Sequence, residues 1–429
     1  MIILFVVFCI TVLLGVPVAF CLGLAALAFL VFAGSESLLV LPTLVFSGMD
    51  SFPLMAIPFF IMAGDLAERS GILPNLVNLA KAMVGHWRAG LAHVSIVTEM
   101  FLSGVTGTAV GDAAAIGSIF IPSMKREGYD GKFSAVLTAS ASVIGPLIPP
   151  SVGMLIYAFV QGGTVSVAAL FLAGVVPGVL VGVGLMALSY ILARKRNYPV
   201  SGDKFHLMTF VRAVPRALMG LMAMIIILGG ILSGVFTPTE SGAAAVMYVL
   251  IVGAFVTRKL DFVTIWRSLL MTAKVTGSIL ILVGTAKACA WIMTSSQVPQ
   301  KFGAFLMSIS ASPFFFITLV VIFLVFLGFF IEAMAIMIMF VPVLAPIAAS
   351  YGIEPHHFGL IFVMACQVAL ITPPVSLSLF VTARIAGIPY ESTFREVLPF
   401  LGLISVLTLA VAYWPDLSMW LPRMMGYVR

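Results

Sequence analysis

Two proline-rich stretches interrupt apolar parts of this 429-residue chain. The first, Val143-Ile-Gly-Pro-Leu-Ile-Pro-Pro-Ser151, lies within residues 133–160, which contain no charged side chain. The second, Ala369-Leu-Ile-Thr-Pro-Pro-Val-Ser376, follows 224 positions later, counted from Pro149 to Pro373 (373 − 149 = 224). A proline lacks an amide donor and displaces the carbonyl four residues before it. Both stretches therefore predict backbone carbonyls without partners in an apolar environment.

Such carbonyls need a partner, because an unpaired one in hydrocarbon costs several kcal/mol. A hard cation would satisfy several at once, and hydroxyl oxygens stand close by in the sequence. These are the side chains of Ser140, Ser142, Ser151, Thr372 and Ser376. Neither stretch contains a carboxylate, so the pattern predicts a weakly held, exchangeable monovalent ion such as sodium. The alternative is a proline kink whose carbonyls bond to neighbouring Ser and Thr.

A third stretch, Ser103-Gly-Val-Thr-Gly-Thr-Ala-Val-Gly-Asp112, combines three glycines with three hydroxyl residues inside the apolar run 89–124. Glycine weakens a helix, so we expect an unwound turn here. Its counterpart 224 positions later, Leu327 to Glu332, keeps one glycine and loses the hydroxyls. Close packing between helices is the other reason for such small residues.

Charged side chains inside apolar segments are functional candidates, because burying them is costly. They are Asp65, Asp112, Lys287, Glu332 and Arg384. A guanidinium can grip a carboxylate in bidentate fashion, so Arg384 is a candidate for binding an anionic substrate, as are Thr106 and Asp112. Arg384 could equally form an internal ion pair or lie near a helix end.

Helices in a membrane must position these residues, because 62% of the chain is hydrophobic, only 9% is charged and the mean hydropathy is +1.20. The apolar runs predict an all-α polytopic membrane protein with eleven to thirteen membrane segments, some of them re-entrant hairpins. A separate shorter helix is expected at 263–274, and Gly15-Val-Pro17 should divide the first run. Thr237-Pro-Thr-Glu240 predicts a helix N-terminus closed by a capping box.

The remaining composition excludes several classes of site. The net charge of +6 is concentrated in short polar connections, which indicates membrane topology and not nucleic-acid binding. The four cysteines and five histidines show no metal-ligand spacing, so we expect neither a cofactor nor a metal beyond sodium. The first Lys or Arg is Arg69, so the N-terminal segment is expected to remain as a membrane helix.

A gap-free shift of 224 positions superposes glycines and prolines of the two halves. The pairs are Gly104 with Gly328, Pro122 with Pro346, Gly128 with Gly352, Pro149-Pro150 with Pro373-Pro374, and Gly163 with Gly387. We therefore expect a first repeat at 1–195, a cytoplasmic linker at 196–216 and a second, inverted repeat at 217–429. Paired broken helices at corresponding positions are typical of secondary transporters.

Five motifs together resemble one family, the large membrane (M) subunit of tripartite ATP-independent periplasmic (TRAP) transporters, of the DctM type. They are Phe52-Pro-Leu-Met-Ala-Ile-Pro-Phe-Phe-Ile-Met-Ala-Gly-Asp65, Ser103-Gly-Val-Thr-Gly107, Gly145-Pro-Leu-Ile-Pro-Pro150, Gly234-Val-Phe-Thr-Pro-Thr-Glu240 and Thr372-Pro-Pro374. The resemblance spans the chain. It implies an elevator-type ion transporter fold in the bacterial inner membrane, with sodium as coupling ion.

The same resemblance implies partners and site residues. The partners are a small four-helix membrane subunit (Q subunit), a periplasmic substrate-binding protein (P subunit), membrane lipids and an organic-anion substrate such as a dicarboxylate, a sialic acid or another sugar or organic acid. One sodium site would comprise Ser103, Gly104, Gly145, Pro149 and Pro150. The other would comprise Gly328, Thr372, Pro373 and Pro374. Arg384 stands where the family pattern has a small or apolar residue.

Three other functions remain open at this point. The chain could be a stand-alone sodium-coupled organic-anion symporter, a passive channel or a membrane-embedded enzyme. No P-loop, H-E-x-x-H or G-x-S-x-G motif occurs in the sequence, which disfavours ATP-driven and hydrolytic chemistry. The duplicated helix break disfavours a channel, because alternating access requires two mobile parts around a site. We therefore expect a transporter and no enzymatic activity.

Overall fold

The computed structural model describes residues 1–33, 37–50, 52–198, 205–374 and 376–428. These residues form helices and connecting turns without a β-sheet, which confirms the all-α class. The first half contains α1 Ile2–Leu13, α2 Val18–Ala33, α3 Val40–Met49, α4 Ala56–Arg69, α5 Leu73–Val84, α6 Gly90–Thr106, α7 Ala109–Arg126, α8 Gly131–Ala141, α9 Val152–Val160 and α10 Val167–Lys195. The second half contains α11 Leu207–Leu232, α12 Pro238–Ile251, α13 Phe262–Ser295, α14 Val298–Ile309, α15 Pro313–Leu327, α16 Ala333–Ser350, α17 Pro355–Leu370, α18 Leu377–Ala386, α19 Phe394–Tyr413 and α20 Asp416–Met424.

Helix breaks divide the long apolar runs into short helices. Six helices of the described residues are long and apolar enough to cross a membrane, and the bent pair α14–α15 would make a seventh span. The predicted eleven to thirteen segments exceed this number, and the described residues contain further apolar helices of 10–17 residues, namely α1, α2, α3, α8 with its following 3-10 turn, α17 and α18. Gly15 has a positive φ and separates α1 from α2 as predicted. The predicted capping box at Thr237 and Glu240 is confirmed at the start of α12.

The order of helices repeats along the chain. Helices α7 and α16 each have 18 residues and begin at residues 109 and 333, 224 positions apart. Helices α8 and α17 begin at residues 131 and 355, with the same spacing. The division at 196–216 and the inverted orientation stay predictions. Of that segment, residues 199–204 lie outside the described residues, and residues 207–216 form the start of α11.

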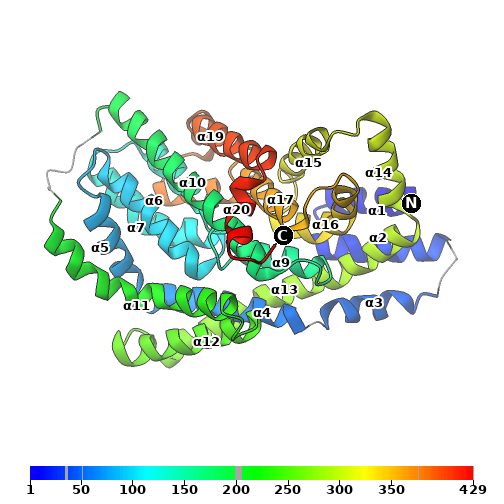
Figure 1. The fold of residues 1–429 in the computed structure, drawn as a ribbon, viewed down its shortest axis with the longest axis horizontal. Coiled ribbons are helices and arrows are strands. Elements are labelled where there is room, and N and C mark those ends of the chain that lie inside the picture. The colour runs from blue at the N-terminus through cyan, green and yellow to red at the C-terminus, as the bar shows by residue number, and fades with distance from the viewer. Residues whose placement is uncertain (34–36, 51, 199–204, 375, 429) are drawn as a thin grey trace.

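Helix α13 connects the two ends of the elongated molecule (Figure 1). It packs against α2, α3, α4 and α16, while α11 and α12 lie with α5 and α4 toward the other end. The prediction of a separate helix at 263–274 is wrong, because the helix continues through Lys274 without a proline until Ser295. At 1.5 Å per residue its 34 residues span about 51 Å, so it is longer than a bilayer core about 30 Å thick.

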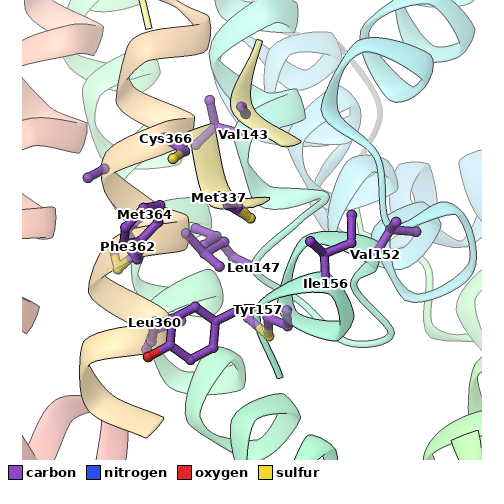
Figure 2. Packing of buried hydrophobic residues seen from close by; sticks show 14 of the residues in the cluster. Val143, Leu147, Val152, Ile156, Tyr157, Met337, Leu360, Phe362, Met364 and Cys366 are labelled. Atoms are coloured by element: carbon purple, nitrogen blue, oxygen red, sulfur yellow. The ribbon is translucent and has the colours of Figure 1, made fainter. Parts of the chain in front are cut away.

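Helix α9 packs against α16 and α17 of the second half (Figure 2), while α8 packs against α18 and α19. Tyr157 of α9 lies beside Gly359 of α17, where any side chain would collide with the tyrosine ring. The Tyr157 hydroxyl also donates a hydrogen bond to the Pro355 carbonyl at 3.0 Å. Val143 and Leu147, from the first proline stretch, lie in the same buried cluster. The two halves therefore share one core beside the proline stretches.

Candidate functional site

The first break lies between α6 and α7. Helix α6 continues to Thr106, Gly107 adopts a left-handed φ of 63°, and Thr108 is extended before α7 begins. A Cβ at Gly107 would lie 2.6 Å from the Pro150 carbonyl oxygen, so the break is in direct contact with the proline stretch. The predicted unwound turn is thus confirmed, and it is confined to Gly107 and Thr108.

Three oxygen atoms converge beside Gly145. The Asp112 carboxylate and the backbone carbonyls of Thr108 and Ser142 all lie within 3.2 Å of the point that a Cβ on Gly145 would occupy. They come from three segments: the start of α7, the α6–α7 break and the short 3-10 turn Ser142–Ile144. Several oxygens around one small space are what a hard cation requires. We refer to these four residues as the Gly145 oxygen cluster.

A second buried carboxyl stands next to this cluster. Glu99 of α6 faces Asp112, and both residues are 0% exposed. None of their four carboxyl oxygens has a hydrogen-bond partner among the described residues. The sequence analysis singled out Asp112 and missed Glu99, although its signal was available, because Glu99 is an acid inside the apolar run 89–124. The two acids place negative charge where a cation or a proton would be stabilised.

The hydroxyl groups near the first break bond mainly to their own helices. Ser103 Oγ donates to the Glu99 carbonyl at 2.6 Å, and Ser142 Oγ donates to the Ala139 carbonyl at 2.9 Å. Ser151 Oγ accepts from the Met154 amide and caps α9. Each hydroxyl oxygen retains a free lone pair after donating its proton. These contacts leave an ion-binding role for Ser103 untested.

The freed carbonyls differ between the two proline stretches. In the first, the Gly145 and Pro146 carbonyls accept no hydrogen bond from the described residues, while Ser142 O accepts from the Gly145 amide at 3.0 Å. In the second, the Leu370 carbonyl accepts from Ser376 Oγ at 2.5 Å. The Ala369 carbonyl accepts from the Thr372 amide at 3.0 Å. Local hydrogen bonds therefore satisfy the two freed carbonyls of the second stretch. In the first stretch they satisfy Ser142 but not Gly145 and Pro146.

The second break lies between α15 and α16, from Gly328 to Glu332. It meets the second proline stretch through Gly328, because a Cβ there would collide with the Ala369 methyl group. Thr372 is 8% exposed and donates to the Val368 carbonyl at 2.6 Å. Both proline pairs, Pro149-Pro150 and Pro373-Pro374, have cis peptide bonds.

Tyr390 makes two hydrogen bonds to the end of the second proline stretch. Its hydroxyl donates to the Pro374 carbonyl at 3.1 Å and accepts from the Ser376 amide at 3.0 Å. No motif in the sequence predicted this contact of Tyr390, because it forms only when the chain after α18 folds back against the second proline stretch.

The other predicted residues take separate places. Gly104 faces Met224 of α11, where a Cβ would overlap the methionine sulfur, so close helix packing explains this glycine. Arg384 is exposed and lines a hollow of about 250 Å³ with Phe380 and Tyr390. The neighbouring Ile385 lies against Gly117 of α7, one and a half turns beyond Asp112. Arg384 therefore does not line the Gly145 oxygen cluster.

Two of the remaining charged candidates have structural partners. Asp65 accepts from Arg69 at 2.8 Å and from Ser268 of α13, so it links α4 to α13. Lys287 donates to the Ser47 carbonyl of α3 at 3.0 Å. Glu332 is the N-cap residue of α16 without a side-chain cap hydrogen bond.

Comparisons with known proteins agree with this architecture. The chain shares 36% identity with the sialic acid TRAP transporter large permease protein SiaM of Vibrio cholerae, over 96% of each protein. It shares 37% identity with the isethionate TRAP transporter permease protein DctMQ of Oleidesulfovibrio alaskensis, covering 97% of this chain and 65% of that protein. The YdaH transporter of Alcanivorax borkumensis has a similar fold, with a TM-score of 0.64, 16% identity and 89% coverage of each chain.

The family model described as the DctM component of the tripartite ATP-independent periplasmic transporter matches residues 5–417. This range includes both proline stretches, both breaks and the Gly145 oxygen cluster. The chain therefore belongs to the DctM family, the large membrane components of TRAP transporters.

Proposed function

We propose that this chain is the large membrane subunit of a sodium-coupled TRAP transporter that imports an organic anion. The observation that supports the coupling ion is the Gly145 oxygen cluster, in which three oxygens from separate segments lie close together beside a glycine. A second ion would bind at the other stretch, near Thr372 and the Gly328 break. Sodium fits sites built mainly from carbonyl and hydroxyl oxygens.

The proposed substrate class rests on the relatives. Sialic acid and isethionate, named for two of them, are both organic acids, one a carboxylate and the other a sulfonate. We propose a substrate of this class and assign its contacts to the region of Thr106 and Asp112, with Arg384 as a further candidate. A cation bound in the Gly145 oxygen cluster would stabilise an anion beside it, which is a physical reason for coupling.

The proposed partners follow from the tripartite family. A periplasmic binding protein would deliver the substrate, and a small membrane subunit would complete the membrane component in the bacterial inner membrane. The relative named DctMQ, of which this chain covers 65%, supports a close association of large and small components. The elevator-like movement of α6 to α9 and their counterparts in the second half is part of the same proposal.

Reconstitution tests the proposal. Proteoliposomes would contain this chain with a small TRAP membrane subunit and a TRAP binding protein from the same organism, and uptake of radiolabelled sialic acid and isethionate would be measured. We expect uptake of a cognate acid to require an inward sodium gradient and the binding protein. Equal uptake with external choline would contradict sodium coupling. Equal uptake without the binding protein would favour the stand-alone symporter.

A further inference from the structure

A basic pocket lies between α5 and the beginning of α11, away from both proline stretches. Its volume is about 580 Å³, and Lys81, Arg212 and Arg216 line it together with Asn75 and Asn78. Polar residues alternate with packing residues on both helices. On α5 the spacing of Asn75, Asn78 and Lys81 is three residues, which places all three on one face.

The pocket is open because the two helices touch only along their other faces. Ile72 and Leu76 of α5 pack against Gly220 and Ala217 of α11 in a small separate core. Toward the beginning of α11 the apolar contact between the two helices ends, and their polar side chains line the pocket. Most of the pocket lining therefore lies on these two helices, and the adjoining connections complete it with Gly85, His86, Phe205 and His206.

The lining carries positive charge without a matching acid. Among the described residues that line the pocket there is no aspartate or glutamate. None of the four ion pairs among the described residues involves Lys81, Arg212 or Arg216. Three cations and two amide groups around one hollow can bind a phosphate group, because all five are hydrogen-bond donors and three neutralise its charge.

The surface beside the pocket is apolar. On α11 the exposed fractions of Leu207, Met208 and Val211 are 65%, 62% and 53%, and Trp87 beyond the end of α5 is 43% exposed. A free phosphate would gain nothing from this surface, whereas acyl chains would cover it. Exposed tryptophan and basic residues at helix ends are typical of the membrane interface, where anionic headgroups lie.

From this combination we infer that the pocket between α5 and α11 binds the phosphate headgroup of an anionic phospholipid, whose acyl chains lie along α11. The site would anchor the α5–α11 end of the protein in the membrane. It does not depend on the substrate or on the coupling ion.

Native mass spectrometry of the purified chain tests the inference, with cardiolipin, phosphatidylglycerol and phosphatidylcholine as probes. In the variant Lys81→Gln/Arg212→Gln/Arg216→Gln we expect about 100-fold weaker binding of the two anionic lipids, from about 1 kcal/mol per lost cation. The control Arg258→Gln/Lys259→Gln/Arg267→Gln removes three exposed cations from the connection around the start of α13 and should keep wild-type binding. The single variant Arg212→Gln, at an exposed position, should give about fivefold weaker binding even if the triple variant folds poorly.

Three results would overturn the inference. Equal losses in the control variant would show a general effect of surface charge. Displacement of the lipid by millimolar inorganic phosphate would identify a free-anion site. Unchanged lipid binding with loss of the co-purified small subunit would make the pocket a protein contact.

Discussion

The two broken hairpins share a proline pair and differ in the chemistry beside it. Position by position, with the spacing of 224 residues, Gly145 of the first corresponds to Ala369 of the second. Three oxygens lie within 3.2 Å of the position that a Cβ on Gly145 would occupy, whereas the Ala369 methyl group is packed against Gly328. A single methyl group therefore separates an oxygen-lined space from a close apolar contact.

The two hairpins also differ in their buried acidic residues, which among the described residues occur only in the first. Asp112 corresponds to Ile336, and Glu99 corresponds to Phe323. Ile336 is fully buried, so the second half has an apolar side chain where the first half has an unpartnered carboxyl. The repeat preserves the proline pairs and the length of α7 and α16, while the side chains at the breaks are specialised. The first site should therefore bind a cation more strongly, because it adds a formal negative charge to neutral oxygens.

Gly145→Ala should have the largest effect. Its methyl group would enter the Gly145 oxygen cluster and expel any ion there, and overpacking costs about 1–3 kcal/mol of stability. We expect sodium-driven uptake to fall more than tenfold in proteoliposomes, with a lower melting temperature. The matched variant Ala369→Gly should retain uptake, because it removes a methyl group without blocking oxygens. If Gly145→Ala kept full sodium-dependent uptake, the cluster would not be an ion site.

Asp112→Asn should have the next largest effect. The change keeps the shape of the side chain and removes its charge, so we expect at least a tenfold higher sodium concentration for half-maximal uptake. Glu99→Gln is the control, because it removes the charge at the neighbouring position. We expect it to raise the melting temperature measured without sodium, since it relieves repulsion between two buried acids. Identical sodium dependence of Asp112→Asn and wild type would leave Asp112 with a packing role only.

The broken helices and their pairing were predictable because glycine and proline act on the backbone locally. The adjacent prolines Pro149-Pro150 and Pro373-Pro374 interrupt helices, whereas single prolines such as Pro122 lie inside one, and the constant spacing of 224 residues linked the two copies. The capping box at Thr237 was equally predictable, since its contacts span only three residues. Local chemistry therefore identified the elements and the region of the site.

The partners of these elements were not predictable, because they depend on how distant helices approach. Nothing local distinguishes Gly104, which faces Met224, from Gly145, which faces oxygens. Glu99 gains its importance only from its position opposite Asp112. Arg384 was a reasonable candidate by residue type, yet α18 carries it to an exposed hollow. The predicted sodium ligands Ser103 and Thr372 remain to be tested.

Tyr390→Phe should affect only the second hairpin. The change removes a donor to the Pro374 carbonyl and an acceptor for the Ser376 amide, each worth about 1 kcal/mol. We expect a lower melting temperature and faster amide hydrogen exchange in α18, with α9 unchanged. Tyr157→Phe is the corresponding control, since it removes the hydrogen bond that Tyr157 donates to Pro355 and the one that it accepts from Gln161, and it should leave α18 exchange unaltered. Equal acceleration in α9 and α18 would show that the two hairpins unfold as one unit.

The smallest effects should come from the hydroxyl variants Ser103→Ala and Thr372→Val. Each hydroxyl already donates to a carbonyl of its own helix, at Glu99 and Val368, so the variant loses only an oxygen that could contact an ion. Loss of one neutral ligand worth about 1 kcal/mol predicts a roughly fivefold higher sodium requirement for uptake. The rise should be smaller for Ser103→Ala, because the Asp112 charge remains in the first site, and larger for Thr372→Val, because the second site has no carboxylate in its proline stretch. A larger rise for Ser103→Ala would contradict the assignment of the stronger site to the first hairpin.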